Sequence, residues 1–344
     1  MMLHLILAAA IVSNGWSNQS AKLLHALDHA ILSFPAHRAD LERKFGKSQA
    51  IDLGVRLADD EAAFSETIPA GYSEDAFHET LETIARLDLG LIARAETWTK
   101  PQLLNEPGLH AGFVQSPTDG LWEPLAVYVP PHHAANPPIA FVIHGRPQTE
   151  TELLGQSYFR SLADGTGTVL VAPWGRGIYD FEGVAKTDVE ALVPIAQATF
   201  ATDAHKSFLV GYSMGGFTVF KIGTTKPWAG VMCVSGSMLN SEVPGIRFAW
   251  RETPVYVVNG SSDAVIPPLY GMETAVFLDS LGIPTSFYQQ PGGSHSVRTL
   301  MPQLQRAWTD MHQGITRPAS IPQIQSRNGV LPAPPRTHDG VLKP

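Results

Sequence analysis

The residues best suited to chemistry begin with a serine in a Gly-x-Ser-x-Gly pattern. Ser213 follows the apolar run 208–210 and precedes a segment of helical character. A serine in this setting lies on a strained turn between a strand and a helix, which holds its hydroxyl above the sheet. Gly211 and Gly215 suit the turn, because a side chain at either position would collide with the neighbouring strand or helix. The pattern predicts Ser213 as a nucleophile.

A serine hydroxyl is a weak nucleophile, so it needs a base, and the base needs an acid that orients it. Asp263 follows the apolar run 254–258, and His295 follows the run 285–288 in a glycine-rich loop. Both would leave the carboxyl ends of parallel strands, the edge where Ser213 also lies and where open α/β sheets bind ligands. The order predicts Asp263 as the acid and His295 as the base.

Other roles and other acids remain open for this site. Asp263 could cap the helix that follows it, and His295 could be a solvated loop histidine. Asp188 is a rival acid, although helix capping is its expected role. Glu242 is the stronger rival, because it also follows a predicted strand.

An oxyanion formed at Ser213 needs at least two donors. The backbone N–H of Met214, the residue after the nucleophile, is the first. The second is expected after the strand that ends at residue 143, where Gly145 lets the backbone approach and Arg146 offers its N–H. Pro147 has no N–H to give.

The side chains of this loop have more ordinary roles open to them. His144 is expected to be a structural hydrogen-bonding residue rather than a base. The Arg146 side chain could bind a substrate carboxylate, but pairing with Glu150 or Glu152 is the expected role. These expectations leave the backbone of the loop as its chemical contribution.

Aromatic residues at strand ends are candidates for lining a substrate pocket, with Gly145 beside them: Trp174, Tyr179 and Trp122. Aromatics at such places serve as packing just as often. No cluster of histidines and carboxylates has the spacing of metal ligands, and no glycine-rich phosphate loop is present. We therefore expect neither a metal nor a cofactor.

The elements that must position these residues begin at about residue 108, where short apolar strands alternate with helices. Such alternation predicts an α/β fold with a mostly parallel sheet covered by helices on both faces. The expected strands are 112–115, 125–130, 139–143, 168–173, 208–211, 230–235, 254–258 and 285–289. The expected helices are 151–163, 188–199, one after Ser213, 268–281 and 297–311. The first two strands pair through a turn at Asp119-Gly120, and the short 235–254 segment leaves no room for an inserted lid.

Four regions divide the chain. Residues 19–107 have helical periodicity and form an N-terminal extension, in which Ser73 is the expected N-cap of a helix. Residues 108–313 hold the α/β domain. Residues 314–344 carry six prolines and no periodicity, which predicts a disordered or draped tail.

The first 18 residues resemble a signal peptide. The apolar run 3–12 has the right length and is followed by small residues, but Lys22 is the first basic residue. The alternative is the start of a cytoplasmic helix, and the working expectation is export to a secreted or periplasmic location. The run is too short to span a bilayer, so no stable membrane insertion is expected.

Composition narrows the function classes. The chain has 344 residues, of which 44% are hydrophobic and 16% charged, as expected for a globular protein with a large core. The formal net charge of −8 argues against a nucleic-acid partner. Cys233 is the single cysteine, so no intramolecular disulfide forms, and it is expected to be a buried small hydrophobe.

Four ordered blocks resemble the α/β-hydrolase superfamily, in particular its carboxylesterase, dienelactone-hydrolase and prolyl-oligopeptidase-like members. The blocks are His144-Gly145, the segment 211–216, the segment 260–267 and the segment 292–296. The resemblance covers about residues 108–312 and implies Ser213 as nucleophile, Asp263 as acid and His295 as base. It departs from the family at Arg146, where a small residue is common.

The resemblance implies a cofactor-independent serine hydrolase that cleaves small-molecule carboxylic esters through an acyl-enzyme. A serine peptidase or an acyltransferase would use the same residues, although the helical extension does not look like the substrate-gating domain of a peptidase. The hypothesis from another class is a non-catalytic ligand-binding protein of the same fold. Such proteins commonly lose one of the three residues, and here all three are present. The sequence leaves the oligomeric state open.

Overall fold

Eight strands form a single sheet in the order β1-β2-β4-β3-β5-β6-β7-β8. The strands are β1 (Gly108–Gln115), β2 (Trp122–Val129), β3 (Ile139–Ile143), β4 (Val169–Pro173), β5 (Ser207–Tyr212), β6 (Gly230–Val234), β7 (Val255–Gly260) and β8 (Thr285–Gln290). β2 runs antiparallel to both β1 and β4, and all other neighbours are parallel. The mostly parallel sheet with an antiparallel start is confirmed.

This computed structural model describes residues 18–317, except residues 70, 96, 99–102 and 178–180. The predicted signal peptide at 1–18 and the predicted tail at 314–344 lie almost wholly outside the described residues. Within the described part of the chain, no helix is both long enough and apolar enough to cross a membrane.

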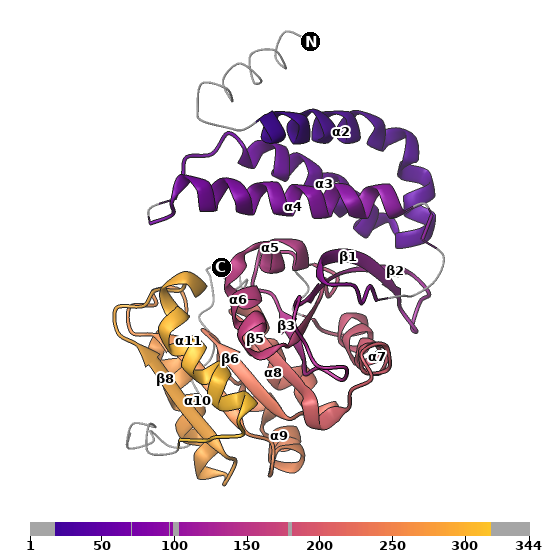
Figure 1. The fold of residues 1–344 in the computed structure, drawn as a ribbon. Helices are drawn as coiled ribbons and strands as arrows, with labels where there is room; N and C mark the ends of the chain where they lie inside the picture. Colours follow the sequence, from indigo (N-terminus) through magenta and orange to yellow (C-terminus); the bar gives the residue numbers. More distant parts are fainter. Residues whose placement is uncertain (1–17, 70, 96, 99–102, 178–180, 318–344) are drawn as a thin grey trace.

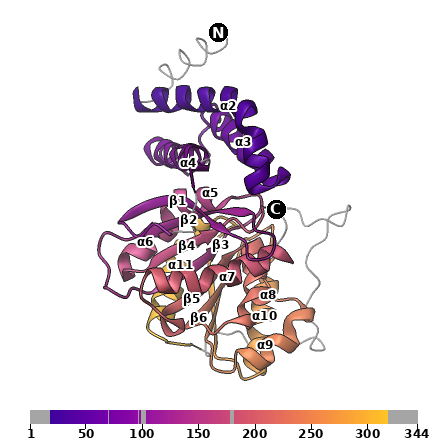
Figure 2. The same cartoon turned by 90° about the vertical axis from the view of Figure 1, so that its right-hand side faces the viewer.

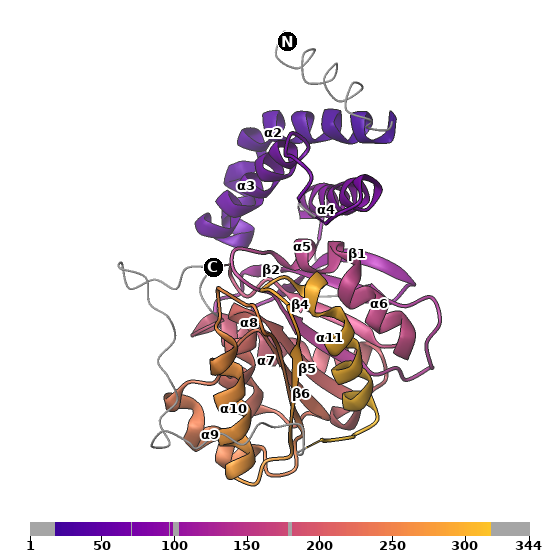
Figure 3. The same cartoon turned by 90° about the vertical axis from the view of Figure 1, so that its left-hand side faces the viewer.

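Helices cover both faces of the sheet, as predicted. They are α5 (Glu150–Gly155), α6 (Ser157–Thr166), α7 (Val184–Thr199), α8 (Met214–Ile222), α9 (Val243–Ala249), α10 (Pro268–Ser280) and α11 (Val297–His312). Successive side chains of a strand point to opposite faces. In β3, Phe141 packs into the core formed with α7, α8 and α10, whereas Val142 packs into the core formed with α5, α6 and α11. Figures 2 and 3 show these two helix layers from opposite sides.

Two predicted helices differ from the observed ones. The helix expected at 151–163 is two helices, because Gln156 between them is extended with ψ 141°. The helix expected from Asp188 begins four residues earlier, after Gly183, whose φ is 58°. The capping role of Asp188 is therefore wrong. The carboxylate instead lies 7% exposed inside α7 and accepts a hydrogen bond from Arg176.

The connection between β6 and β7 stays short, as expected. It contains a short 3₁₀ turn (Asn240–Glu242) and α9, so no lid domain is inserted there. Cys233 in β6 is fully buried in the core, which confirms its prediction as a small hydrophobe.

Where the structure describes the N-terminal extension, it consists of three helices: α2 (Asn18–Phe45), α3 (Lys47–Ala63) and α4 (Glu74–Ala95). The Ala76 N–H lies 3.3 Å from the Ser73 hydroxyl, which confirms Ser73 as the cap of α4. The extension packs beside β1, β2 and α5 (Figure 1). One apolar cluster joins the two parts, with Phe45 and Leu91 from the extension and Phe113 and Trp122 from the sheet.

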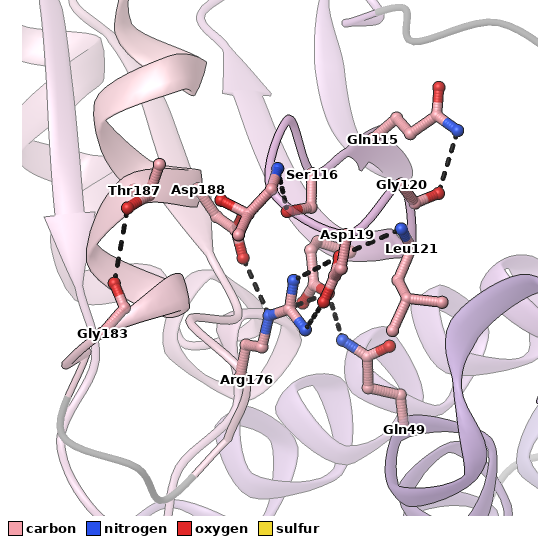
Figure 4. Close-up of polar contacts among 12 residues, drawn as sticks. Gln49, Gln115, Ser116, Asp119, Gly120, Leu121, Arg176, Gly183, Thr187 and Asp188 are labelled. Carbon is pink, nitrogen blue, oxygen red and sulfur yellow. Dashed lines mark hydrogen bonds and ion pairs between the residues drawn. The ribbon is translucent and has the colours of Figure 1, made fainter.

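A polar cluster around Arg176 holds the antiparallel end of the sheet together (Figure 4). The guanidinium binds both oxygens of Asp119, at 2.8 and 3.1 Å. Its Nε lies 2.8 Å from Asp188 and 3.2 Å from Glu123. Gln49 of α3 also donates to Glu123, so the cluster reaches the extension. Burial raises the pKa of Glu123 to about 8, and the hydrogen bonds from Arg176 lower the pKa of Asp119.

Replacing Arg176 with glutamine should lower the free energy of unfolding by about 3 kcal/mol at neutral pH, because it leaves the buried carboxylate of Asp188 without its cation. Arg176 has a φ of 62°, and glutamine is no less suited to this conformation than arginine. Denaturant unfolding of both proteins measures the loss. Lys186→Gln, which removes a partly exposed helix pair, should change stability by no more than about 0.5 kcal/mol. Equal stability of the Arg176 variant and wild type would contradict the prediction.

A second set of charges lies where α3 and α4 meet α5. Burial raises the pKa of Asp60 to about 9, and the carboxylates of Asp88 and Glu152 add to the shift. Native Asp60 therefore holds a proton that the unfolded chain has released. The higher pKa of Asp60 in the folded state stabilises the fold fully below the unfolded pKa of about 3.9. This stabilisation is lost as the pH rises toward the pKa of Asp60 in the folded state.

Asp60→Asn keeps the shape of the side chain and removes this pH dependence. We expect the free energy of unfolding of this variant, relative to wild type, to increase by about 4 kcal/mol between pH 5 and pH 8, about 1.4 kcal/mol per pH unit. Urea unfolding of both proteins at the two pH values provides the measurement. An offset that does not change with pH would contradict the prediction.

Candidate active site

The serine predicted as nucleophile lies on a strained turn between β5 and α8. Ser213 has φ 54° and ψ −116°, a conformation that non-glycine residues adopt at a cost. The turn is also crowded. A Cβ at Gly211 would lie 2.0 Å from the Gly215 carbonyl oxygen, and a Cβ at Gly215 would lie 2.1 Å from the Ile143 oxygen. Only glycine fits at these two positions, as the sequence pattern indicated.

The structure brings the three predicted residues together. The Oγ of Ser213 lies 2.9 Å from Nε2 of His295, and Nδ1 of His295 lies 2.8 Å from Oδ2 of Asp263. The Asp263 side chain is fully buried. Its second oxygen accepts the N–H groups of Val265 and Ile266, both at 2.9 Å. Asp263 thus fixes its own turn and the imidazole at the same time.

The rival acids are engaged elsewhere. Glu242 accepts the Leu239 N–H at 2.7 Å, and burial raises its pKa to about 7. Asp188 binds Arg176, as described above. Among the carboxylates that the structure describes, Asp263 is the one hydrogen-bonded to His295.

The loops that carry the acid and the base are joined as one unit. The Ser262 N–H donates to the Gly293 carbonyl at 2.8 Å, and the Ser261 N–H donates to the Gln290 carbonyl at 2.9 Å. A Cβ at Gly260 would lie 2.2 Å from the Gly293 oxygen. The glycines on both sides let the loops touch through their backbones, which holds Asp263 and His295 in register.

Tyr212 is a contributor that the sequence did not reveal. Its hydroxyl donates to the His295 backbone carbonyl at 2.6 Å, and the two rings lie 5.4 Å apart. Burial raises the pKa of this hydroxyl. The residue occupies a variable position of the Gly-x-Ser-x-Gly pattern, so the only available signal was an aromatic side chain beside the serine. It fixes the backbone of the predicted base.

The loop predicted to hold the second oxyanion donor lies against the serine. A Cβ at Gly145 would lie 3.0 Å from Cβ of Ser213 and 3.1 Å from the Tyr212 ring. His144 is buried, and its two ring nitrogens each lie 2.9 Å from a backbone carbonyl, of Gly145 and of Trp174. Burial lowers its pKa. These contacts agree with the structural role expected for His144.

Met214 and Arg146 each follow a residue that lies in this contact. Met214 is the first residue of α8, directly after Ser213, and Arg146 directly follows Gly145. Their roles as oxyanion donors stay predictions. The two expected partners of the Arg146 side chain have other contacts. Glu150 receives Arg56 on both oxygens, and Glu152 accepts the N–H of the helix cap Thr149.

The predicted aromatic lining has a mixed outcome. Trp174 is 4% exposed and carries the guanidinium of Arg56 over its ring at 5.4 Å. Trp122 is buried in the apolar cluster shared with the extension. Tyr179 lies outside the described residues. Contact of Trp174 or Tyr179 with a substrate stays a prediction.

The arrangement is suited to acyl transfer. An imidazole at hydrogen-bond distance from a hydroxyl can accept its proton during attack on a carbonyl, and a buried carboxylate on the other nitrogen stabilises the imidazolium that forms. In the part of the chain that the structure describes, no three histidine, cysteine or acidic side chains gather in a way that could hold a metal ion.

The strand order, the strained turn at Ser213 and the order of the three residues along the chain define an α/β-hydrolase fold. No family model matches the sequence. The chain is similar to a bifunctional acetylxylan esterase/xylanase of Neocallimastix patriciarum, 26% identical over 151 residues. That match covers 43% of this chain and 22% of the relative, so it spans about a fifth of the relative's length.

Solved structures of low sequence identity superpose on part of this chain. A fluorophosphonate-binding serine hydrolase of Staphylococcus aureus superposes with a TM-score of 0.49 at 15% identity, over 60% of this chain and 99% of that one. A poly(3-hydroxybutyrate) depolymerase from Bordetella parapertussis has a TM-score of 0.49 at 16% identity, over 62% of this chain and 92% of that one. Neither match includes the whole of this chain.

Proposed function

We propose that the protein is a serine hydrolase that cleaves carboxylic esters through an acyl-enzyme on Ser213. The observation that carries the proposal is the continuous hydrogen-bonded series from Ser213 through His295 to the buried Asp263, at 2.9 and 2.8 Å. The esterase activity named for the curated relative is consistent with this class of substrate.

In the proposed reaction, Nε2 of His295 takes the hydroxyl proton while Oγ of Ser213 bonds to the ester carbonyl carbon. The carbonyl electron pair moves to its oxygen. Its return breaks the bond to the leaving alcohol, which takes the proton from His295. A water molecule then repeats these steps on the acyl-enzyme, releases the acid and restores the serine. Asp263 keeps the imidazole oriented and balances its positive charge.

The negative oxygen of the intermediate lies between the N–H groups of Met214 and Arg146 in this proposal. The start of α8 adds its unpaired N–H groups and the positive end of its dipole. Donors fixed in place before the reaction stabilise the charge without reorganisation, which makes them the largest expected contribution to rate.

The test combines intact-mass analysis after fluorophosphonate treatment with hydrolysis of p-nitrophenyl esters from acetate to laurate. We expect a single adduct on Ser213 and an optimum chain length that measures the acyl pocket. A folded sample that takes no adduct and hydrolyses none of the esters would overturn the proposal. Labelling of Ser213 without ester hydrolysis would overturn the ester assignment and favour a peptidase or an acyltransferase.

A further inference from the structure

Arg56 is a buried cation that the N-terminal extension places against the α/β domain. Its side chain, in the middle of α3, is 5% exposed. The guanidinium binds both oxygens of Glu150 in α5, at 2.7 and 3.1 Å. Asp52 lies 3.0 Å from its Nε, and Asp88 of α4 lies 3.7 Å from Nη1. Three carboxylates from three helices thus converge on one arginine.

Two contacts of Arg56, with Glu150 and with Trp174, connect it to the two ends of the segment 144–149, here called the oxyanion loop. Glu150 is the residue that follows the loop and opens α5. Trp174 lies beneath the guanidinium at 5.4 Å, and its carbonyl lies 2.9 Å from Nε2 of His144, the first residue of the loop. Arg56 therefore contacts Glu150, directly after the loop, and Trp174, whose backbone carbonyl bonds to the first residue of the loop.

A small displacement of the oxyanion loop would change the geometry at Ser213. The backbone at Gly145 lies against Ser213, with the space for a Cβ closed at 3.0 Å. A displacement of about 1 Å in groups that orient a reaction can cost about 100-fold in rate. A cation that fixes both ends of this loop is placed to set the position of the Arg146 N–H.

Docking of the extension does not depend on Arg56 alone. The apolar cluster with Phe45, Leu91, Phe113 and Trp122 joins the extension to β1 and β2 by itself. A buried bidentate ion pair is not needed for attachment, since a buried pair contributes little net stability compared with apolar packing. The position of the Arg56–Glu150 pair beside the oxyanion loop therefore indicates a role other than attachment of the extension.

Building on the function proposed above, we propose that Arg56 is a positioning residue of the esterase reaction. Through Glu150 and Trp174 it holds the oxyanion loop in the geometry that stabilises the transition state. The N-terminal extension is then a part of the catalytic apparatus, although none of its residues touches the substrate in this role.

The test uses the full chain and the variants Arg56→Gln/Glu150→Gln, Arg56→Lys and Arg38→Gln. The double variant removes the cation together with its main partner, so no isolated charge stays on Glu150. We expect its kcat for p-nitrophenyl acetate to fall about 10- to 100-fold with KM changed less than about twofold, because oxyanion contacts strengthen in the transition state. The rate of fluorophosphonate labelling should fall in parallel.

The other two variants separate positioning from charge alone. Arg56→Lys keeps the cation but loses the bidentate contact, so it should recover only part of the kcat. Arg38→Gln removes an exposed arginine of α2 that binds Glu42 at 2.7 Å, and its kinetics should equal those of wild type. A folded double variant with the kcat of wild type, or one that changes KM alone, would overturn the proposal.

Hydrogen exchange measured by mass spectrometry gives a readout that needs no activity. Peptides covering 144–155 should exchange faster in the double variant, whereas peptides of the shared apolar cluster should not. Unchanged exchange in 144–155 would overturn the positioning role. If wild type takes no fluorophosphonate and hydrolyses no ester, the proposed function fails, and the exchange data still decide whether Arg56 holds the loop.

Discussion

Ser213→Ala should lower kcat/KM for p-nitrophenyl esters by about 10⁴-fold or more, because the acyl-enzyme can no longer form. Alanine should be tolerated at this position. The strained conformation is already that of a residue with a Cβ, and the neighbouring glycines provide the space. The remaining activity would come from binding and from the oxyanion donors.

Three measurements check this result on one sample: ester hydrolysis, fluorophosphonate adduct mass and thermal unfolding. The variant should unfold within a few degrees of wild type and take no adduct. A variant that retains more than a tenth of wild-type turnover would contradict the assignment of Ser213. Loss of both activity and cooperative unfolding would indicate a folding defect, which Ser213→Gly or Ser213→Cys would then resolve.

Asp263→Asn should lower kcat by about 10⁴-fold with little change in the fold. The asparagine oxygen can still accept the N–H groups of Val265 and Ile266, which both lie 2.9 Å from Oδ1. Its amide would then face Nδ1 of His295 as a donor. The imidazole would carry its proton on Nε2 and could no longer accept the proton of Ser213.

Glu242→Gln is the matched control, since it neutralises the rival acid in the same way. Its carboxylate bonds to the Leu239 N–H and makes no contact with His295 among those described. We expect kcat within about twofold of wild type. If Glu242→Gln were the inactive variant and Asp263→Asn the active one, the acid would have to be reassigned. Rates across pH 6–10 should show whether Asp263→Asn recovers activity at high pH.

The sequence predicted which three side chains would come together because the signal for each of them is local. A strand, a small turn and a polar residue lie within about ten residues of one another at Ser213, Asp263 and His295. Once parallel strands are inferred, their carboxyl ends meet at one edge and bring the three residues together. The strand order was not predicted, because alternation gives a mostly parallel sheet but not the crossover that places β4 between β2 and β3.

The contacts that support the site were harder to predict because they join distant segments. Arg56 and Glu150 are 94 positions apart, and no motif connects them. A weak signal did exist. Ala50, Leu53 and Leu57 form an apolar stripe at helical spacing, and Arg56 lies on the same buried face. A charged residue on an apolar face predicts a buried partner without identifying it.

Arg176 was missed for a related reason. It follows β4 between two glycines and looks like an ordinary loop residue. Its three carboxylates come from the β1–β2 turn, from β2 and from α7, and only the folded sheet brings them together. The contact also gives Asp188 a role that the sequence did not indicate, since the capping role was expected only because the start of α7 was predicted four residues too late.

The apolar cluster between the extension and β1 and β2 has a consequence for how the chain can be divided. Phe113 and Trp122 lie on a sheet face that the extension covers, and Phe45 and Leu91 meet them from the other side. A chain that begins at residue 108 would expose these side chains to water beside β1, the edge strand of the sheet. We expect such a chain to self-associate, because an exposed apolar patch next to an open strand edge favours pairing between molecules. The extension thus resembles a small subunit that is fused to the α/β domain. The covalent link keeps it at a high effective concentration beside the sheet face that it covers.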